Sequence, residues 1–380
     1  MSESNSMRNL FHFSILILSI MIGCARFKVQ DLSTSTLLIL PMATETKSFN
    51  QIKVTVKEGA LYGLPARPGV LSNRIILPFT AQNYSLEFSE NSKSPKTIFL
   101  PESTKLDTET LANHEKIKTV KLPIGRIGLS TPVGDEAAVI QLFKASPENS
   151  KEEARPEYQL PSVLEPNSFD QSESEVYYVH SPTDRPQKLK STESGQTKFS
   201  YIEQILASNH DLLYIIHLFQ TNNIETIALN VYKNYKLIAV LTIPDSLLTA
   251  QVEVEAIFPF SGTSEAIASI VYRQKNSFEP KERKLYHLKP NSEPVKIFSY
   301  TNKDDLPFWS IANGGFLLAH DEDGSGMLIK IYNSDGEYQS NHRIDYQEYR
   351  ESWLDTYYQS EDRLISVRLN KGNYEIVEWK

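Results

Sequence analysis

Residues 315–345 read GFLLAHDEDGSGMLIKIYNSDGEYQSNHRID and carry the strongest fold signal in the chain. Three short runs follow one another here: Gly315–Glu322, Met327–Ser334 and Glu337–Asp345. Apolar residues that alternate with polar ones predict β-strands with one buried face. The Asp335-Gly336 pair supplies the backbone freedom of a tight hairpin between the second and third runs. The stretch therefore predicts consecutive antiparallel strands.

The same grouping recurs through the C-terminal half. Its first run begins at Leu212, Ala266, Gly315 and Arg363, which are 54, 49 and 48 residues apart. Two fainter copies begin at Arg74 and Glu136. Four short strands at a period of about 40–50 residues are the signature of a β-propeller blade. We expect an all-β propeller of six blades, with seven as the alternative count. A pair of β-sandwiches or an irregular β domain would leave the long period unexplained.

Closure of the ring requires one further strand. The last predicted blade lacks an outer strand, and Gln51–Lys57 (QIKVTVK) alternates with period two near the other end. Pairing the two would remove exposed sheet edges, which invite aggregation. We therefore expect 51–380 to form the propeller, after a signal peptide at 1–23 and a tether at 24–50.

Cys24 is the only cysteine in the chain. It follows Arg8, the apolar run Leu10–Ile22 and the small residue Gly23, in the order of a secretory signal. The run has 13 residues, fewer than the roughly 20 that span a bilayer. A sole cysteine at this position predicts lipidation, and a plain signal peptide or short anchor is the alternative.

Residues 7–24 resemble a bacterial lipoprotein signal, and Met21-Ile22-Gly23-Cys24 is similar to the relaxed boxes of spirochaetal, particularly leptospiral, lipoproteins. The resemblance implies a diacylglyceryl group on the Cys24 sulfur, a further acyl chain such as palmitate, and attachment to the cell envelope. We expect the outer membrane, on its periplasmic or its surface side. The hairpin at Asp335-Gly336 resembles the outer hairpin of six-bladed NHL-type propellers.

Composition narrows the partners. The net charge of −8 argues against nucleic acid, which would need a basic stripe. Residues 145–175 hold four prolines and seven glutamates, so we expect a disordered insertion. A docking arm and a solvated loop are both open for it. The run Lys281-Glu282-Arg283-Lys284 predicts a solvated hairpin.

Few residues indicate a catalytic, metal-binding or ligand-binding site. The chain has no Gly-x-Ser-x-Gly, His-Glu-x-x-His or Gly-rich phosphate motif, so no catalytic residue and no cofactor is predicted. Asp321 and Asp323 are the best-placed pair for calcium, but the further ligands that such a loop needs are missing, and no metal is expected. Candidate ligand-binding residues on the innermost strands, around the channel, are Arg67, Arg126, Glu203, Glu255, Trp309 and Asp355. They could equally be solvated groups paired with one another.

These patterns predict a membrane-anchored envelope lipoprotein whose propeller is a scaffold for binding an envelope protein or glycan. An envelope hydrolase or lyase at the channel mouth is the alternative, because propellers host both roles. A component of outer-membrane assembly machinery is a further possibility.

Overall fold

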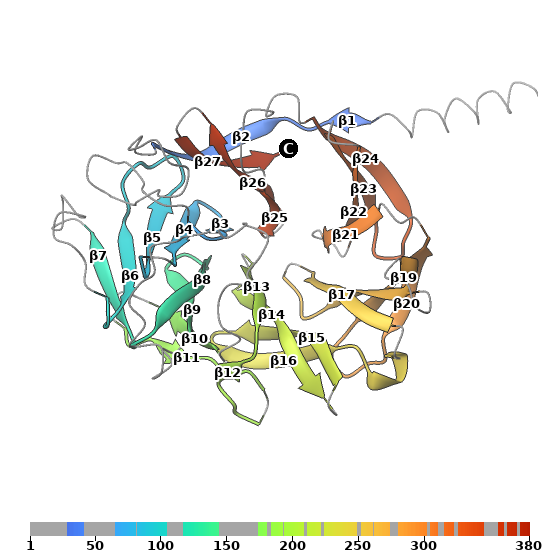
Figure 1. The fold of residues 1–380 in the computed structure, drawn as a ribbon, viewed down its shortest axis with the longest axis horizontal. Helices are drawn as coiled ribbons and strands as arrows, with labels where there is room; N and C mark the ends of the chain where they lie inside the picture. Colours follow the sequence, from blue (N-terminus) through green and yellow to red (C-terminus); the bar gives the residue numbers. More distant parts are fainter. Residues whose placement is uncertain are drawn as a thin grey trace, which may run out of the picture.

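A computed structural model places most of the residues that it describes in strands (Figure 1). The structure describes residues 29–41, 65–80, 82–104, 117–143, 174–180, 184–192, 194–208, 211–221, 224–248, 252–260, 262–273, 280–301, 305–310, 315–322, 326–345, 356–360, 363–370 and 373–380. The signal peptide, Cys24, Gln51–Lys57, Asp323 and Asp355 lie outside these residues, as does the expected insertion up to residue 173.

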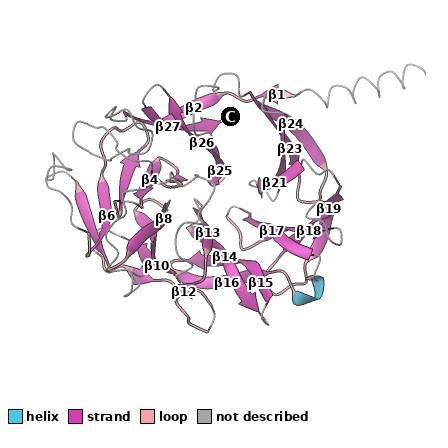
Figure 2. Ribbon diagram, in the orientation of Figure 1, coloured by secondary structure: helices cyan, strands magenta, loops and turns pink. Residues whose placement is uncertain are grey.

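Six small sheets stand around a common axis as the blades of a propeller (Figures 1 and 2). Blade 1 contains β3 (Gly69–Leu71), β4 (Arg74–Phe79), β5 (Tyr84–Ser89), β6 (Thr97–Pro101) and β7 (Lys118–Leu122). Blade 2 contains β8 (Arg126–Val133), β9 (Ala137–Phe143), β10 (Ser174–Val179), β11 (Gln187–Lys188) and β12 (Lys198–Phe199). Blade 3 contains β13 (Ile202–Ala207), β14 (Leu212–Thr221), β15 (Ile224–Lys233) and β16 (Lys236–Thr242).

The other three blades follow the same plan. Blade 4 contains β17 (Val252–Pro259), β18 (Ala266–Arg273), β19 (Pro280–Leu288) and β20 (Val295–Tyr300), after the short 3-10 helix η6 (Asp245–Leu247). Blade 5 contains β21 (Asp305–Ser310), β22 (Phe316–Asp321), β23 (Gly326–Tyr332), β24 (Tyr338–Asp345) and β1 (Gln30–Asp31). Blade 6 contains β25 (Thr356–Ser360), β26 (Arg363–Asn370), β27 (Asn373–Trp379) and β2 (Thr34–Pro41). The predicted all-β, six-bladed propeller is confirmed, and the count is six rather than seven.

An N-terminal strand closes the ring, as predicted, but the segment that does so differs from the one expected. Strand β2 pairs antiparallel with β27 and becomes the outer strand of blade 6, with Leu38 opposite Ile376. The prediction that Gln51–Lys57 supplies this strand is wrong for this edge of the sheet, since Thr34–Pro41 occupies it. The assignment of all of 24–50 to a tether is wrong at 30–41 for the same reason.

Strand β1 extends this closure to blade 5. It pairs parallel with β24, placing Gln30 opposite His342 and Asp31 opposite Arg343. The amide of Leu32 donates to the Arg343 carbonyl at 2.8 Å. Residues Ser33 and Lys380 then exchange two backbone hydrogen bonds at 2.9 Å. One N-terminal segment therefore covers the outer edges of two neighbouring blades.

The inner strands of all six blades run in the same direction. In each blade the strands from β3, β8, β13, β17, β21 or β25 outwards form an antiparallel meander, to which β7 in blade 1 and β1 in blade 5 add as parallel outer strands, and the chain returns to the axis in its starting direction. We call the end at which these strands begin the start mouth. Inner strands also approach closely, because a Cβ on Gly69 would lie 2.5 Å from the Ser130 carbonyl oxygen. Only glycine fits there.

Apolar side chains fill the spaces between blades. Between blades 6 and 1, for example, Leu40 and Tyr374 pack with Leu77 and Leu86 in one buried cluster. Between blades 3 and 4, Tyr214 and Val231 pack with Ala268 and Ile270. Burial of a large apolar side chain contributes about 1.5–3 kcal/mol, so these faces hold the ring together.

The hairpin between β23 and β24 forms as predicted, with a different turn geometry. Only Gly336 has a positive φ, 82°. The Asn333 side chain accepts from the amides of Asp335 and Glu337 at 3.1 and 2.8 Å. A two-residue turn with two positive φ angles occurs instead between β15 and β16, at Asn234 and Tyr235.

Candidate functional site

The start mouth gathers charged residues from separate blades. Arg67 lies two residues before β3 of blade 1, Arg126 is the first residue of β8 in blade 2, and Glu203 is the second residue of β13 in blade 3. Because these inner strands run in one direction, the three positions lie at the same end of the axis. Three of the predicted candidates therefore share one mouth of the propeller.

Arg67 and Glu203 interact electrostatically although their blades are not neighbours in the ring. Burial raises the pKa of the Glu203 carboxyl above its usual range, and the positive charge of Arg67 opposes that rise. The Glu203 side chain still reaches solvent, so it is crowded by the blades without being sealed off. Burial, followed by the charge of Glu203, raises the pKa of the Tyr201 hydroxyl. The mouth thus holds a carboxylate, a guanidinium and a phenol near one another.

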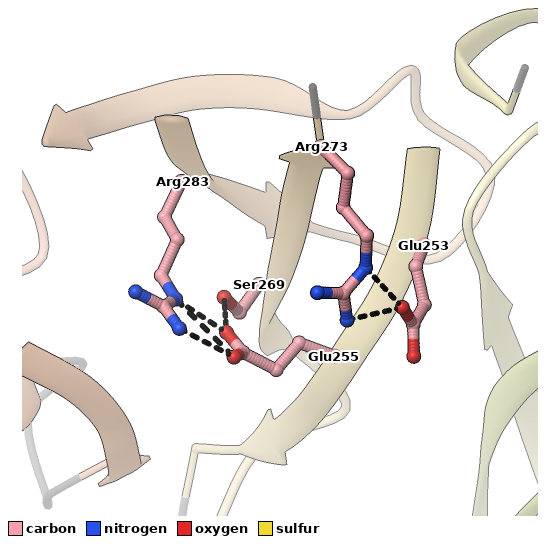
Figure 3. A network of polar contacts seen from close by, with 5 residues as sticks. All are labelled: Glu253, Glu255, Ser269, Arg273 and Arg283. Carbon is pink, nitrogen blue, oxygen red and sulfur yellow. Dashed lines mark hydrogen bonds and ion pairs between the residues drawn. The ribbon is translucent and has the colours of Figure 1, made fainter. Parts of the chain in front are cut away.

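Glu255 does not belong to this group. Arg283 Nε donates to Glu255 Oε2 at 3.0 Å and to Oε1 at 3.2 Å, and Nη2 donates to Oε1 at 3.1 Å (Figure 3). The Ser269 hydroxyl donates to Oε2 at 3.0 Å. Arg283 is 5% exposed. A forked pair of this kind fixes both side chains, and it engages both carboxylate oxygens within blade 4.

A second pair lies beside the first and is more open to water. Arg273 Nε and Nη2 both donate to Glu253 Oε2, at 2.9 and 2.6 Å (Figure 3). The side chains of Arg273 and Glu253 are 33% and 58% exposed. Pairs this exposed contribute about 0–1 kcal/mol to stability.

Both pairs lie on the face of blade 4 that turns toward blade 5. Strand residues two apart share a face, so Ser269 lies on the same face as Ile267, which packs against Phe316 and Leu318 of blade 5. The opposite face carries Ala268 and Ile270 and packs against blade 3. We call the space between blades 4 and 5 the 4–5 seam.

The other sequence candidates are only partly placed. Arg126 is exposed and lies opposite Phe143 on β9. Trp309 lies in β21 opposite Leu317, and only its backbone is described. Asp355 precedes β25 and lies outside the described residues. The structure thus brings Arg67 and Glu203 together and assigns Glu255 to a different part of the ring.

The calcium candidates are also only partly described. Asp321 ends β22, paired with Met327, while its side chain and all of Asp323 lie outside the described residues. Within the part of the chain that the structure describes, no three His, Cys, Asp or Glu side chains are grouped as metal ligands.

Sequence reasoning missed Arg283. The expectation of a solvated hairpin at Lys281-Glu282-Arg283-Lys284 is wrong, because these residues lie within β19 and Arg283 is buried. The alternation of residues in β19 could have predicted this burial, because Arg283 lies on the same face as the core residue Leu285. Its neighbours Glu282 and Lys284 are half-buried and form an ion pair at 3.4 Å, with the Lys284 ammonium over the Tyr272 ring.

Comparisons with known proteins identify no family for this chain. No family model matches the chain, and no curated protein matches it either. Among solved structures, it is similar to the β-propeller domain of the Trilobed protease from Pyrococcus furiosus, with 9% identity, a TM-score of 0.45 and coverage of 83% of this chain and 84% of that one. It is also similar to polysaccharide lyase Uly1, with 8% identity, a TM-score of 0.41 and coverage of 93% and 99%. Likenesses this distant say nothing about activity.

No helix among the described residues is both long and apolar enough to cross a membrane.

Proposed function

We propose that this chain is a lipid-anchored protein of the bacterial cell envelope whose propeller is a binding scaffold. The observation that carries the proposal is the meeting of Arg67 from blade 1 with Glu203 from blade 3 at the start mouth. A closed ring holds such groups in fixed positions, and charge arranged in this way contributes to specificity. An envelope protein or a glycan is the proposed partner.

Glu255 gives the enzyme alternative no catalytic carboxylate. A catalytic carboxylate presents an oxygen to the substrate, whereas both oxygens of Glu255 accept hydrogen bonds from Arg283 or Ser269. Its role is to hold blade 4 together. The start mouth, where Glu203 reaches solvent, is the proposed contact surface.

The binding proposal is tested by crosslinking in cells followed by recovery of the protein. The charge-reversal variants Arg67→Glu and Glu203→Lys should lose a partner that the wild type captures. The matched control is Lys236→Glu on exposed β16, which should retain it. An identical set of captured molecules in all four proteins would exclude the start mouth as the contact.

The anchoring proposal rests on Cys24, Gly23 and the preceding apolar run. Anchoring of this kind takes about two acyl chains. Cys24→Ala should abolish labelling by a fatty-acid analogue and move the protein from the outer-membrane fraction to the aqueous fraction. A labelled or membrane-bound variant would contradict lipidation at this residue.

A further inference from the structure

The N-terminal segment enters the propeller at its rim. Strand β1 lies on the outer strand of blade 5, and β2 continues as the outer strand of blade 6 (Figure 1). Backbone hydrogen bonds from Leu32 and Ser33 fix the step between the two blades. The chain is therefore fastened to the rim from Gln30 onward.

The lipidated residue lies close to this attachment in sequence. Residues 25–29 are the only ones between Cys24 and β1. A chain spans at most ~3.6 Å per residue when fully extended, so the six steps from Cys24 to Gln30 cover no more than about 22 Å. A domain of this length has a radius of gyration of about 20 Å, and hence a diameter near ~50 Å. The anchor cannot reach across the ring.

Exposed apolar side chains occur on this segment. Val29 is 39% exposed and Ile39 is 41% exposed. The other exposed large apolar side chains among the described residues are Ile124 at 67%, Tyr235 at 42%, Ile238 at 48% and Val295 at 59%. Of the six, only Val29 and Ile39 lie on the segment that leads from the anchored end of the chain.

We propose that in the anchored protein the rim of blades 5 and 6 faces the lipid headgroups and the rim of blades 2 and 3 points away. This inference rests on the lipid anchoring at Cys24 proposed above. With the ring standing on its edge, the start mouth opens parallel to the membrane and stays accessible to a partner. The membrane surface is thus the occupant of the rim of blades 5 and 6.

The test uses two single-cysteine variants of the lipidated protein. Gln339→Cys lies on β24 of blade 5 and Lys236→Cys on β16 of blade 3, and both positions are exposed near the outer edges of their blades. Lipid on the Cys24 sulfur leaves the introduced thiol as the one that takes a donor dye. Energy transfer to acceptor headgroups is then measured in liposomes of phosphatidylethanolamine and phosphatidylglycerol.

Transfer from residue 339 should be severalfold higher than from residue 236, and should vanish for both in detergent. Equal transfer would mean that the ring lies flat, and higher transfer from residue 236 would place the blade 3 rim on the membrane. Either result overturns the orientation while leaving the anchor intact. Absence of the lipid mass, or failure to float with liposomes, would instead remove the anchoring proposal and the orientation with it.

Discussion

The space between blades 6 and 1 and the 4–5 seam solve the same packing problem with different side chains. Between blades 6 and 1, Leu38, Leu40 and Tyr374 are 1% exposed and pack in an apolar cluster, and Arg363 of blade 6 donates to the Ser72 carbonyl of blade 1 at 2.6 Å. We call this space the closing seam. In the 4–5 seam, the ring of Phe316 stacks on that of Tyr332, with centroids 5.0 Å apart. The Arg283–Glu255 pair lies in the same seam.

Chain connectivity accounts for this difference. Blades 4 and 5 are consecutive in sequence, whereas the closing seam joins blade 1 to blade 6, whose outer strands β2 and β27 come from near the two ends of the described chain. The entropic cost of closing a loop rises by about 0.6 kcal/mol for each doubling of its length. The closing seam must also hold the N-terminal strand β2, which is far in sequence from the other strands of blade 6. Dense apolar burial supplies most of this free energy, because the ion pair of Arg363 with Glu90 in the closing seam is long, at 3.8 Å, and partly exposed.

Removal of the closing strand should have the largest effect. A soluble chain that begins at Met42 lacks β1 and β2, and so exposes the partners of Leu38 and Leu40 together with the edge of β27. Each lost leucine forfeits about 1.5–3 kcal/mol of burial. We expect aggregation or a greatly lowered melting temperature, measured by circular dichroism and gel filtration.

The matched control is a chain that begins at Gln30, which lacks only residues 24–29 of the mature form and should melt like the full soluble chain. Equal melting temperatures for the chains that begin at 30 and 42 would show that β2 is dispensable. Deletion of 51–57 alone, if it opened the ring, would restore that segment as a closing element.

The error over the closing strand shows how far the sequence predicts this fold. The 48–54-residue period identified six blades because each meander repeats the same strand pattern. The choice between Thr34–Pro41 and Gln51–Lys57 could not be made, since both sequences suit a strand and neither encodes its distant partner. The sequence predicted Arg67 and Glu203 as channel residues because they lie near the starts of inner strands. The Arg283–Glu255 pair joins residues 28 apart across two strands, and a register is needed to see it.

The second largest effect is expected at a buried ion pair in the space between blades 1 and 2. Arg74 Nε donates to Glu87 Oε1 at 2.7 Å, and its Nη1 donates to the Gly134 and Ala137 carbonyls of blade 2 at 2.9 and 2.8 Å. Breaking a buried pair costs about 3–5 kcal/mol, because the remaining charge is left without a partner. Arg74→Met should lower the free energy of unfolding by that amount in urea titrations.

The double variant Arg74→Met, Glu87→Leu tests the cause. It removes both charges and should recover much of the loss. A double variant as unstable as Arg74→Met alone would mean that the carbonyl contacts, rather than the unpaired carboxylate, carry the effect.

Arg283→Met tests the 4–5 seam and should lower the free energy of unfolding by less than Arg74→Met does. The Glu255 side chain is 25% exposed, whereas that of Glu87 is 10% exposed, so water can partly solvate the carboxylate that is left behind. We expect a loss of about 1–3 kcal/mol, the cost of an unsatisfied buried group. Arg273→Ala, at the more exposed pair, serves as the control and should change the free energy of unfolding by at most about 1 kcal/mol. A loss for Arg283→Met as large as for Arg74→Met would remove the distinction between the enclosed and the open pair.

Acid should weaken the space between blades 2 and 3 and spare the closing seam, whose buried cluster contains no histidine among the described residues. His217 is 3% exposed on β14, with its Nδ1 2.8 Å from the Leu218 carbonyl and its ring against Phe199. Burial lowers the pKa of His217, and the neighbouring Asn230 side chain and Leu218 carbonyl oppose that change. The folded protein therefore holds His217 neutral at a pH where the unfolded chain, with a histidine pKa of about 6.5, is already protonated.

Since the unfolded state then binds more protons, stability rises with pH across the window between the lowered pKa and about 6.5. It is fully present above that window and is lost as the pH falls through it, by about 1.4 kcal/mol for each pH unit of the shift. Urea midpoints should accordingly fall between pH 7.5 and pH 5, and His217→Gln should flatten that fall. His342, whose pKa burial also lowers, leaves a residual slope that His342→Gln should remove. An unchanged slope in the His217 variant would mean that the space between blades 2 and 3 accepts the charge of a protonated histidine. This space would then resemble the 4–5 seam, which holds the Arg283–Glu255 pair, more than its side-chain packing indicates.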